Sequence, residues 1–558
     1  MDYSDGENGR KNSDVLSQVS DKLPPRKKLL NMDDAIFKTK FGLFNYAIIF
    51  VSAITLNAVA VETCAVSYVI PVACDMKMTS GQKGILAGAA FFGVICSSYL
   101  WGYLADTKGR RRIIQPTLFL ASFSSIICSF IQNIYIFAAF RFLNGFFISG
   151  SAANIFAYLG EFHTNDKRTT SIISTTVIYN GMCTIVPVTA WAVINQDWQF
   201  QVPIIGLIYK PWRLFMVVCG LPGFISAIAL IFLPESPKFV LSQGKKAAVF
   251  QILQKMNRWN NGKKSEFEEF EILDDVHSIE NKQCISESIK KTRVPLLKSV
   301  WNQTVPLFKP PYLRSTILLC TIQFSLYSVF NGFFMFFAQI INGMSINLNS
   351  FIDDRMPMCE AIKVNTDNMI EIEYNETNSE VCIDKLDVSV MENGIIFELT
   401  FTIGLAIAGL LLGKVGKYPV ILFILLSTGL SGIACILVNI PLLQVMLFVW
   451  LLCSGIVSNV LSSATVDLYP TTLRATAISF SLMFGRLGGV TGANTVAFLL
   501  DDNCEATFYL SGSMLIAISV LAFFIPNIHK RITDSDQDKT KRDPRLSIIS
   551  FRGSVKSF

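Results

Sequence analysis

The chain has 558 residues, of which 51% are hydrophobic and only 16% are charged, and Phe alone contributes 44 residues. Soluble domains average about 25% charged residues. This composition therefore excludes an ordinary soluble enzyme, a disordered chain and a disulfide-stapled secreted module. No His lies at metal-ligand spacing from Cys, so we expect neither a metal nor another cofactor. The composition predicts a polytopic membrane protein, and the net charge of +6 is then an orientation signal rather than a sign of nucleic-acid binding.

Twelve stretches are apolar and long enough to cross a bilayer, which takes about 20 residues of helix. Strands of a membrane barrel would be about half as long and would alternate apolar with polar residues, which these stretches do not. The sequence therefore predicts an all-α membrane protein with twelve transmembrane helices. The predicted spans are 43–71, 82–104, 113–132, 134–158, 171–195, 212–233, 313–341, 393–413, 418–439, 442–466, 475–499 and 506–526.

Lys and Arg crowd alternate connections, and this bias predicts the orientation, since basic residues favour the cytosolic side. The basic segments are both tails and the connections after spans two, four and eight. The other connections are poor in Lys and Arg, and Asp501, Asp502 and Glu505 make one of them acidic. Both termini should therefore face the cytosol. That arrangement requires an even number of spans, and twelve fits.

Two long polar connections divide the chain, and they suggest a six-plus-six organisation. The predicted parts are a cytosolic N-terminal tail (1–40), an N-terminal six-helix bundle (41–233), a cytosolic central loop (234–312), a C-terminal six-helix bundle (313–529) and a cytosolic C-terminal tail (530–558). Within the second bundle, residues 342–392 form an extracytosolic loop.

The 342–392 loop has the composition of an extracytosolic segment, with eleven acidic residues against three basic ones. Asn375 begins an Asn-Glu-Thr glycosylation acceptor sequence. A chance match is the alternative, because Asn302 in the central loop begins a similar sequence. Cys359 and Cys382 lie in the same extracytosolic loop, where oxidising conditions would permit a disulfide between them.

The two halves carry a faint repeat in their cytosolic connections. Glu161 precedes Arg168 by seven residues after span four, and Asp467 precedes Arg474 by seven residues after span ten. Each acid ends a long helix, and each Arg begins the next. Repeated connections between six-helix halves indicate two similar bundles about an axis normal to the membrane.

The most specific string in the chain reads Gly102-Tyr-Leu-Ala-Asp106-Thr-Lys-Gly109-Arg-Arg-Arg112. It places a fixed acid at a helix end and three Arg after a glycine turn, although a positive-inside turn is the plainer reading. The string resembles the signature between helices two and three of the major facilitator superfamily.

Three further strings agree with that resemblance. Arg141-Phe-Leu-Asn-Gly145 resembles the fourth-helix signature of the superfamily. Pro234-Glu-Ser-Pro-Lys238 and Asp467-Leu-Tyr-Pro-Thr-Thr-Leu-Arg474 resemble motifs of its sugar-porter and organic-ion branch. The resemblance implies a fold of two six-helix bundles that move a solute by alternating access.

Within that branch the chain resembles the synaptic vesicle glycoprotein 2 family over roughly residues 41–530. A large acidic, glycosylatable loop between spans seven and eight is also typical of that family. The resembling pieces are Val61-Glu62, Tyr68–Pro71, Ile155–Tyr158 before Glu161, Ala190-Trp191-Ala192, and Trp198–Gln201 leading to Trp212-Arg213. The resemblance implies a glycoprotein of the plasma membrane or of a secretory or synaptic-type vesicle.

Four positions depart from the family pattern. Val59 stands three residues before Glu62, where the family has a second acid, and Gly413 stands where the second-half signature has its acid. Ser458 and Ser462 in the tenth helix replace an expected Trp and Asp. The departures leave the ligand chemistry of the tenth helix open.

Four charged residues stand out within predicted spans, where a charge costs at least about 2.5–3.5 kcal/mol, so each is a functional candidate. Glu62 in span one is a candidate proton carrier, because burial favours its protonated form, or else a carboxylate fixed by an Arg on a neighbouring helix. Arg141 in span four matches an Arg that the superfamily associates with proton coupling, or it is a hydrogen-bond hub. Arg486 in span eleven suits an anionic ligand, as in organic-ion transporters, or is a cation that either snorkels alone or is paired. Glu398 in span eight lies near the outer face, and we expect it at the rim of the cavity.

Aromatic and amide side chains in spans five and seven are candidates for the lining of a central cavity, because such surfaces suit amphipathic organic ligands. Plain helix packing is the alternative. The candidates are Tyr179, Asn180, Trp191, Tyr327, Phe330 and Asn331. Trp191 stands apart, because it lies in the resembling Ala-Trp-Ala string.

The sequence thus predicts a secondary-active transporter for a small organic solute, either an organic ion or a sugar-like molecule. A proton gradient or the solute's own gradient would drive it, since no Walker string points to ATP. Its partners would be the solute, the lipid bilayer and protons. The predicted conformational latches are Asp106 with Arg110 and Arg111, Glu161 with Arg168, and Asp467 with Arg474.

Two other classes of function compete with transport. For an enzyme, the sequence offers no nucleophile–base pair or metal cluster as support. A transporter-like vesicle membrane protein, acting as a receptor or trafficking regulator with little or no transport, is favoured by the departures at Val59, Ser458 and Ser462. The retained Glu62, Arg141 and first-half signature favour transport.

We predict that Asn375 carries a glycan on the extracytosolic side. Glycosidase treatment should raise the gel mobility of the wild-type chain and leave that of Asn375→Gln unchanged. Asn302→Gln is the matched control and should still shift. A shift that persists in Asn375→Gln would contradict the predicted topology of this loop.

Overall fold

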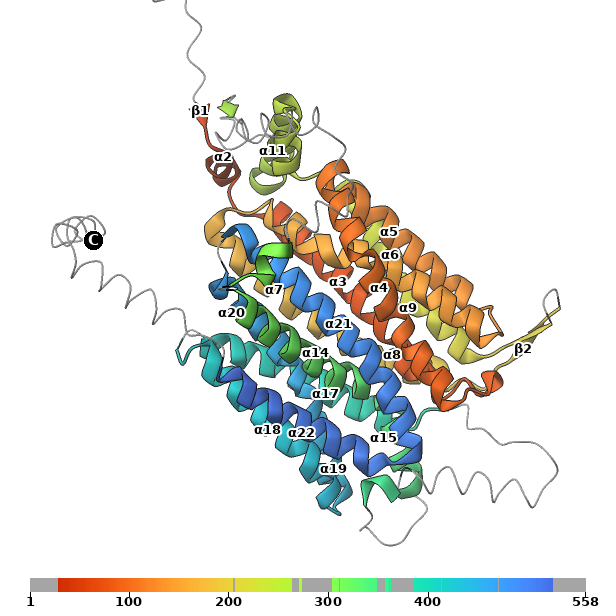
Figure 1. Cartoon of the computed structure of the whole chain (residues 1–558). Helices are drawn as coiled ribbons and strands as arrows, with labels where there is room; N and C mark the ends of the chain where they lie inside the picture. Colours follow the sequence, from red (N-terminus) through yellow and green to blue (C-terminus); the bar gives the residue numbers. More distant parts are fainter. Residues whose placement is uncertain are drawn as a thin grey trace, which may run out of the picture. The chain divides into compact units, whose positions relative to one another are not determined.

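The computed structural model describes residues 29–203, 206–262, 270–272, 304–310, 312–348, 357–360, 362, 385–412, 414–469 and 471–524. These residues are mostly helical and form two compact units (Figure 1). Unit 1 takes its residues from Met1–Ile49, Phe156–Ile172 and Leu233–Arg293. Unit 2 takes them from Phe50–Ile155, Ile173–Phe232 and Val294–Phe558.

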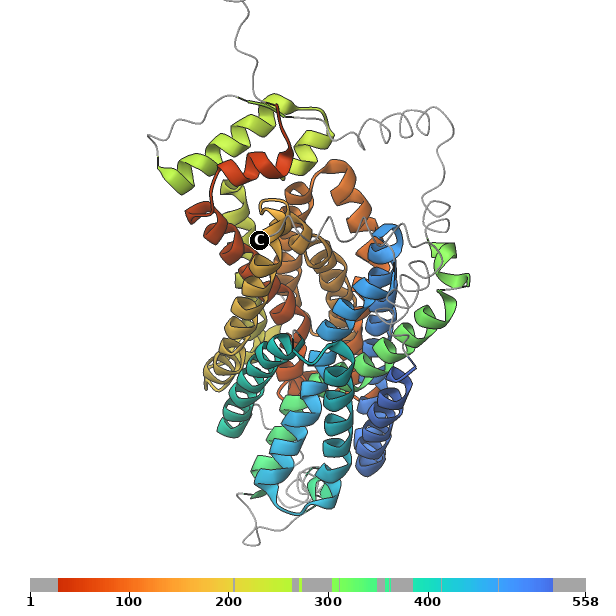
Figure 2. The same cartoon turned by 90° about the vertical axis from the view of Figure 1, so that its left-hand side faces the viewer.

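Each of the twelve predicted spans is confirmed as a helical segment. The long helices of unit 2 run alongside one another in both views (Figure 1 and Figure 2). In chain order the segments are α3 (Leu43–Val69), α4 (Ser80–Lys108), α5 (Arg110–Cys128), α6 (Ile134–Gly160), α7 (Asn165–Cys183) with α8 (Ile185–Ile194), α9 (Pro211–Phe232), α14 (Leu313–Met335) with α15 (Phe337–Leu348), α17 (Val388–Leu412), α18 (Lys417–Leu437), α19 (Pro441–Leu452) with α20 (Ile456–Leu468), α21 (Thr471–Asp502) and α22 (Cys504–Ala522).

Ten of these segments are long and apolar enough to cross a membrane, counted over the described residues. The other two are α5, which begins with three Arg, and α21, which is rich in Gly, Ser and Thr and carries Arg486. Both helices pack within unit 2, α5 against α9 and α21 against α4 and α14. Neighbouring helices can cover polar faces that hydrocarbon would not tolerate. Composition alone therefore underestimates how well α5 and α21 can lie within a membrane.

Three of the predicted spans are broken rather than continuous. The fifth divides into α7 and α8, because Pro187 has no N–H to donate to the carbonyl of Cys183, where α7 ends. The seventh divides into α14 and α15 at Phe336, and a short 3-10 turn at Cys453–Gly455 separates α19 from α20. Discontinuous helices of this kind are typical of binding regions in transporters.

Two small sheets add to the helices. Unit 1 contains a parallel pair, β1 (Leu29–Leu30) with β4 (Glu271–Ile272). Unit 2 contains an antiparallel pair, β2 (Phe200–Val202) with β3 (Leu207–Tyr209). The rings of Trp198, Phe200 and Tyr209 stack on this hairpin with centroids 5.2–6.3 Å apart, which gives the short strands an aromatic face.

Unit 1 is held together by polar contacts between segments far apart in the sequence. Its helices α2 (Met32–Lys38) and α11 (Lys246–Asn261) lie side by side in both views (Figure 1 and Figure 2), and α10 (Pro237–Ser242) packs against α11. Asp33 forms an ion pair with Lys238 at 2.8 Å. Asn260 donates to the carbonyl of Lys40 at 2.7 Å and accepts from the N–H of Phe44 at 2.9 Å, so it caps the chain where α3 begins.

Glycines set the closest helix contacts in unit 2. A Cβ on Gly145 of α6 would lie 2.0 Å from the carbonyl oxygen of Ala90 on α4, and a Cβ on Gly488 of α21 would lie 2.1 Å from that of Phe324 on α14. No larger residue fits either position without moving a backbone. Small residues at such crossings are the usual means of close packing between membrane helices.

The predicted disulfide between Cys359 and Cys382 is wrong, because Cys359 has another partner. Cys359 bonds instead to Cys504 at the start of α22, with their Cα atoms 5.6 Å apart. Cys74 is also disulfide-bonded. Cys382 and Asn375 lie outside the described residues. Proximity in one loop suggested the wrong pair, because pairing depends on how the ends of distant helices meet.

Burial lowers the pKa of His163 in unit 1, although the hydrogen bond between its Nδ1 and the Leu159 carbonyl, 2.8 Å away, opposes that shift. The folded chain therefore favours the neutral ring. The stability that this ring contributes is present above the ordinary histidine pKa of about 6.5 and is lost as the pH falls.

We expect hydrogen exchange in the connection between α6 and α7, corrected for intrinsic rates, to speed up between about pH 7.5 and about pH 5.5. His163→Gln should remove this pH dependence. An equal response in the variant and the wild type would show that another group titrates.

Candidate functional site

Glu62 and Arg141 are both completely buried in unit 2, on neighbouring helices. Glu62 lies on α3, seven residues before its end, and Arg141 lies on α6. The Nη1 atom of Arg141 is 3.7 Å from the carboxylate Oε2 of Glu62. Its Nη2 donates to the backbone carbonyl of the same residue. One guanidinium therefore reaches both the carboxylate and the backbone of Glu62.

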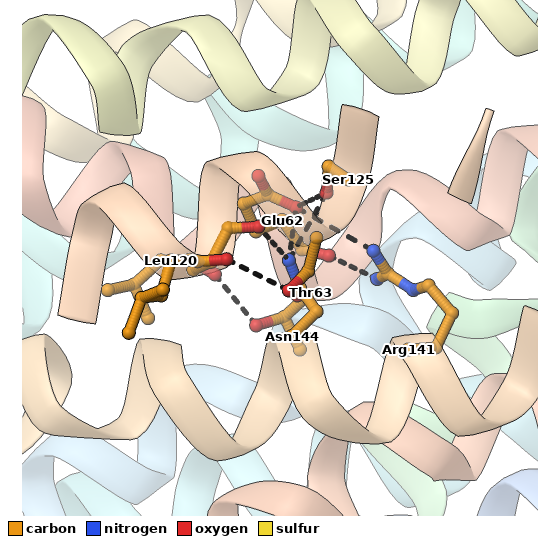
Figure 3. A network of polar contacts seen from close by, with 9 residues as sticks. Glu62, Thr63, Leu120, Ser125, Arg141 and Asn144 are labelled. Atoms are coloured by element: carbon orange, nitrogen blue, oxygen red, sulfur yellow. Dashed lines mark hydrogen bonds and ion pairs between the residues drawn. The ribbon is translucent and has the colours of Figure 1, made fainter. Parts of the chain in front are cut away.

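Two uncharged side chains complete the cluster (Figure 3). Ser125 of α5 donates its hydroxyl to Oε2 of Glu62. Asn144 of α6 donates to the same oxygen at 2.9 Å and to the carbonyl of Ala121 at 3.0 Å. Side chains of α5 and α6 thus converge on a single carboxylate oxygen of α3.

The sequence places these donors by helical spacing. Arg141 and Asn144 are three residues apart, so they lie on one face of α6, and the next residue, Gly145, gives the close contact with α4. The string Arg141-Phe-Leu-Asn-Gly145 therefore combines two donors with a packing position. Sequence reasoning assigned no role to Asn144 or Ser125, although Asn144 stands within a string that it singled out.

The second carboxylate oxygen of Glu62, Oε1, differs from Oε2 in its hydrogen bonding. Among the described residues, Oε1 is buried and has no hydrogen-bond partner. It faces α9, where a Cβ on Gly220 would come within 3.5 Å of it. A proton can therefore bind at Oε1 without displacing Ser125 or Asn144 from Oε2.

A second ion pair in unit 2 joins a buried Arg to a more exposed Asp. Arg213 of α9 donates from Nη2 to Asp75 at 2.6 Å, and from Nη1 to the carbonyls of Ser129 and Ile131 at 3.0 and 2.7 Å. Trp212 donates its indole N–H to the other oxygen of Asp75 at 3.0 Å. Both carboxylate oxygens of Asp75 accept hydrogen bonds, so the Arg213–Asp75 pair has the character of a structural tie.

Arg486 connects α21 with α4. Its Nη1 donates to the hydroxyl of Ser98 at 2.6 Å, and Ser98 is in turn 3.0 Å from the hydroxyl of Ser149. Arg486 is half-buried. No ion pair with a carboxylate of the described residues accompanies this contact, so the paired-cation alternative finds no support there.

The predicted lining residues fall into two groups. Tyr327 of α14 shares a hydrogen bond of 3.1 Å with Ser458, the residue that replaces the expected Trp. Asn331 lies one turn further along α14 and is buried, and its Nδ2 has no hydrogen-bond partner among the described residues. The indole N–H of Trp191 on α8 is likewise buried without such a partner. Asn331 and Trp191 thus retain donors that a bound solute could use.

Glu398 does not lie at a rim. One turn before it on α17, a Cβ on Gly394 would come 2.7 Å from the Pro187 ring of α8 and 3.5 Å from the hydroxyl of Tyr68 on α3. The carboxylate lies within electrostatic range of Cys64, Tyr68 and Cys183. It therefore faces the region where helices of the two halves of the chain meet.

The predicted latch residues are only partly described. Asp106 and Arg110 form an i,i+4 pair at 3.4 Å across Gly109, whose φ of 113° suits a glycine. Arg111 donates to the carbonyl of Ile231 at the end of α9, at 3.0 Å.

The other two predicted latch pairs differ in how much of them the structure describes. Arg168 lies against the end of α6, where a Cβ on Gly160, the residue before Glu161, would come 2.6 Å from its Nε. The side chains of Asp467 and Arg474 lie outside the described part of the chain.

Helices before and after the central connection are tied together at one end of unit 2. We call it the acidic-loop end, because α15 ends and α17 begins there, on either side of the 342–392 connection. Ser67 donates to the carbonyl of Phe334 at 2.8 Å, and Asn195 exchanges two hydrogen bonds with the backbone of Leu386 at 2.7 and 2.8 Å. Ser80 also donates to Asp501, and Lys385 pairs with Asp197 at 2.5 Å. These contacts tie the two halves of the chain together at that end.

We predict that Glu62→Ala and Arg141→Ala each reduce the free energy of unfolding by about 3–5 kcal/mol, because each leaves a buried charge without its partner. The double variant should lose clearly less than the sum of the two. The measurement is a double-mutant cycle on purified protein by thermal or denaturant unfolding. Additive losses would show that the two charges do not stabilise one another.

The comparisons with curated proteins find distant relatives. The chain is 28% identical over 313 residues to synaptic vesicle glycoprotein 2B of Rattus norvegicus, which is 54% of this chain and 46% of that protein. It is 28% identical over 331 residues to synaptic vesicle glycoprotein 2A of Homo sapiens, which is 57% of this chain and 44% of that protein. The matched part is therefore less than half the length of each relative.

Solved transporter structures share the fold. The xylose transporter XylE from E. coli, in a partially occluded inward open conformation, superposes with a TM-score of 0.58 at 13% identity, covering 87% of this chain and 100% of that chain. A point mutant of the nucleoside transporter NupG gives a TM-score of 0.54 at 10% identity, covering 87% of this chain and 99% of that chain. At these identities the likeness concerns the fold alone.

The family model for the Major Facilitator Superfamily matches residues 43–353 and 378–556, which is most of the chain. The match agrees with the helical fold, with the ten candidate spans among the described residues and with the first-half signature at Gly102–Arg112. The chain therefore belongs to the Major Facilitator Superfamily, as an integral multi-pass membrane protein of a transporter family rather than an enzyme.

Proposed function

We propose that this protein moves a small organic solute across a membrane by alternating access, with protons coupled through Glu62. The observation that carries the proposal is the buried pair of Glu62 and Arg141, in which one carboxylate oxygen is bonded and the other is without a partner among the described residues. Two six-helix bundles, 41–233 and 313–529, would rock about a central site.

The energetics of the pair favour a role in the transport cycle over a purely structural one. A buried ion pair gains little net stability over apolar residues of the same volume. Each charge also costs at least about 2.5–3.5 kcal/mol to place in a span. A pair that changes its charge between two states can repay that cost by shifting their populations.

Protonation of Glu62 at Oε1 supplies such a change. Neutralising the carboxylate removes its attraction for Arg141 but leaves the bonds from Ser125 and Asn144 at Oε2 in place. Arg141 would then hold α6 to α3 only through the carbonyl of Glu62. A ligand or proton shifts an equilibrium only by its differential contacts in the two states, and this carboxylate provides one.

The ties at the acidic-loop end would act as a gate. We assign that end to the extracytosolic side and both termini to the cytosol, on the basis of the Lys and Arg bias of the connections. Ser67, Asn195 and Asp501 would then hold the outer gate closed, and it would have to break for solute to enter or leave on that side. Asp106 with Arg110 and Arg111 would act at the cytosolic face, as would the Glu161–Arg168 and Asp467–Arg474 pairs.

A non-transporting vesicle protein is the second candidate, and one observation favours it. Ser458 and Ser462 of α20 are occupied within the protein, Ser458 by Tyr327 and Ser462 by the carbonyl of Ser458 at 2.9 Å. The tenth helix therefore offers fewer free polar groups to a solute than the Trp and Asp that the family resemblance implies. A glycoprotein of a secretory vesicle or of the plasma membrane fits either candidate.

We predict that Glu62→Gln abolishes accumulation of solute driven by a pH gradient but preserves exchange of solute. Gln can accept the bonds from Ser125 and Asn144 with its carbonyl, and its amide imitates the protonated acid. The measurement compares concentrative uptake with counterflow in reconstituted vesicles, using a radiolabelled panel of sugars, organic cations, organic anions and zwitterions.

Glu392→Gln is the matched control, because Glu392 lies on α17 and is exposed. It should behave as the wild type in both assays. If Glu62→Gln concentrates solute as well as the wild type does, Glu62 is structural and the coupling model is wrong. If wild-type vesicles move no member of the panel, the receptor candidate takes precedence.

A further inference from the structure

Two ionisable side chains of opposite sign within unit 2 are left without a counter-ion. Among the described residues, neither Glu398 on α17 nor Arg486 on α21 forms an ion pair, whereas Glu62, Arg141, Arg213 and Asp75 all do. Both side chains are half-buried rather than sealed. Each lies near the middle of a helix that packs against other helices of unit 2.

The surroundings of Glu398 come from three helices. The tight contact between Gly394 and Pro187, one turn before it, brings α17 onto α8, and the Tyr68 hydroxyl of α3 lies beside that contact. Cys64, Cys183 and Tyr179 also lie within electrostatic range of the carboxylate. Glu398 thus lies near thiols and phenols and forms no ion pair within the described part of the chain.

The surroundings of Arg486 are also uncharged. Its guanidinium donates to Ser98 of α4 and lies within electrostatic range of Tyr327. The preceding residue, Gly485, lets α21 approach Tyr327, since a Cβ there would come 3.1 Å from the ring. A Cβ on Gly489, one turn further along, would come 3.3 Å from the Nδ2 of Asn331, the amide nitrogen with no partner. Arg486 and Asn331 therefore place donors along the same contact between α21 and α14.

Two tyrosines lie near the two charged side chains, Glu398 and Arg486. Tyr179 lies within electrostatic range of both Glu398 and Tyr327, and Tyr327 lies within range of Arg486. Each tyrosine is thus near the other tyrosine and near one of the two charged side chains. Such rings accept cations on their faces and also present hydroxyl groups.

We propose that Glu398 and Arg486 are the two ends of one binding site for a zwitterionic solute, with its cationic group at Glu398 and its anionic group at Arg486. Tyr179 and Tyr327 lie along the chain that joins the two groups of the solute. This inference rests on the proposed transport function, because it names the class of solute that the transporter carries.

The physical basis is the cost of a charge without a partner. A solute with a single charge would satisfy one end of the site and leave the other unpaired in a partly dehydrated space. A neutral sugar would leave both unpaired. Only a solute with both charges, held apart by a short chain, satisfies both ends at once.

The test uses the full-length protein in lipid nanodiscs and measures binding by equilibrium dialysis. The probes are the zwitterionic ω-amino acids from glycine to 6-aminohexanoate, with butylamine and butyrate as the singly charged analogues of 4-aminobutyrate. At least one ω-amino acid should bind about tenfold or more tightly than its singly charged analogues, which corresponds to about 1.4 kcal/mol.

The variants assign each end of the site. Glu398→Gln should reduce affinity for the zwitterion to that of the anionic analogue and leave the affinity for the anion unchanged. Arg486→Gln should reduce it to that of the cationic analogue and spare the affinity for the cation. The retained binding of one analogue shows that each variant is folded, and Glu392→Gln is the matched control that should change nothing.

Two results would overturn the site. One is that no ω-amino acid binds better than its singly charged analogues. The other is that both variants weaken all three ligands equally. Uptake of the bound zwitterion into vesicles is measured separately: binding without uptake retains the site and refutes transport, whereas uptake of another solute that is unaffected by Glu398→Gln retains transport and refutes the site.

Discussion

A carboxylate and a guanidinium, both fully buried, impose the central constraint on the first half of this protein. Neither charge can stay in an apolar span alone, so α3 and α6 must meet at the depth of Glu62 and Arg141. Asn144, Ser125 and Gly145 follow from that requirement, since they supply the remaining donors and the close packing that brings them into reach. Among the described residues, Oε1 is the one carboxylate oxygen of this pair that has no hydrogen-bond partner.

The sequence predicted the helices well, because apolar length is a strong and local signal. All twelve segments are helical, and the two that composition understates, α5 and α21, were found in the sequence as apolar stretches. The breaks in the fifth, seventh and tenth segments were not found. Pro187 is visible in the sequence, but its effect depends on which carbonyl loses its donor. The turn at Cys453–Gly455 contains no proline that would mark a break in the sequence.

The site was harder to predict than the fold, because partners are a matter of three dimensions. The sequence identified Glu62 and Arg141 separately, and an Arg fixing Glu62 was one of the alternatives considered, but spacing along the chain could not show that they pair. Cys359 was assigned to the wrong cysteine for the same reason. Glu398 was placed at a rim from its depth in the span, whereas the face of α17 that it occupies is decided by the contact of Gly394 with Pro187.

Pairing separates the charges within unit 2 into three kinds. Arg213 and Asp75 pair with one another, and Trp212 and two nearby carbonyls add further hydrogen bonds, so this pair has the character of a permanent tie. Glu62 and Arg141 satisfy one another only while Glu62 is charged, so a proton can release them. Glu398 and Arg486 have no counter-ion among the described residues, and each therefore carries an electrostatic cost that the folded chain leaves uncompensated. In the proposed transport cycle, the first pair would hold the bundle, the second would switch it, and the third would select the solute.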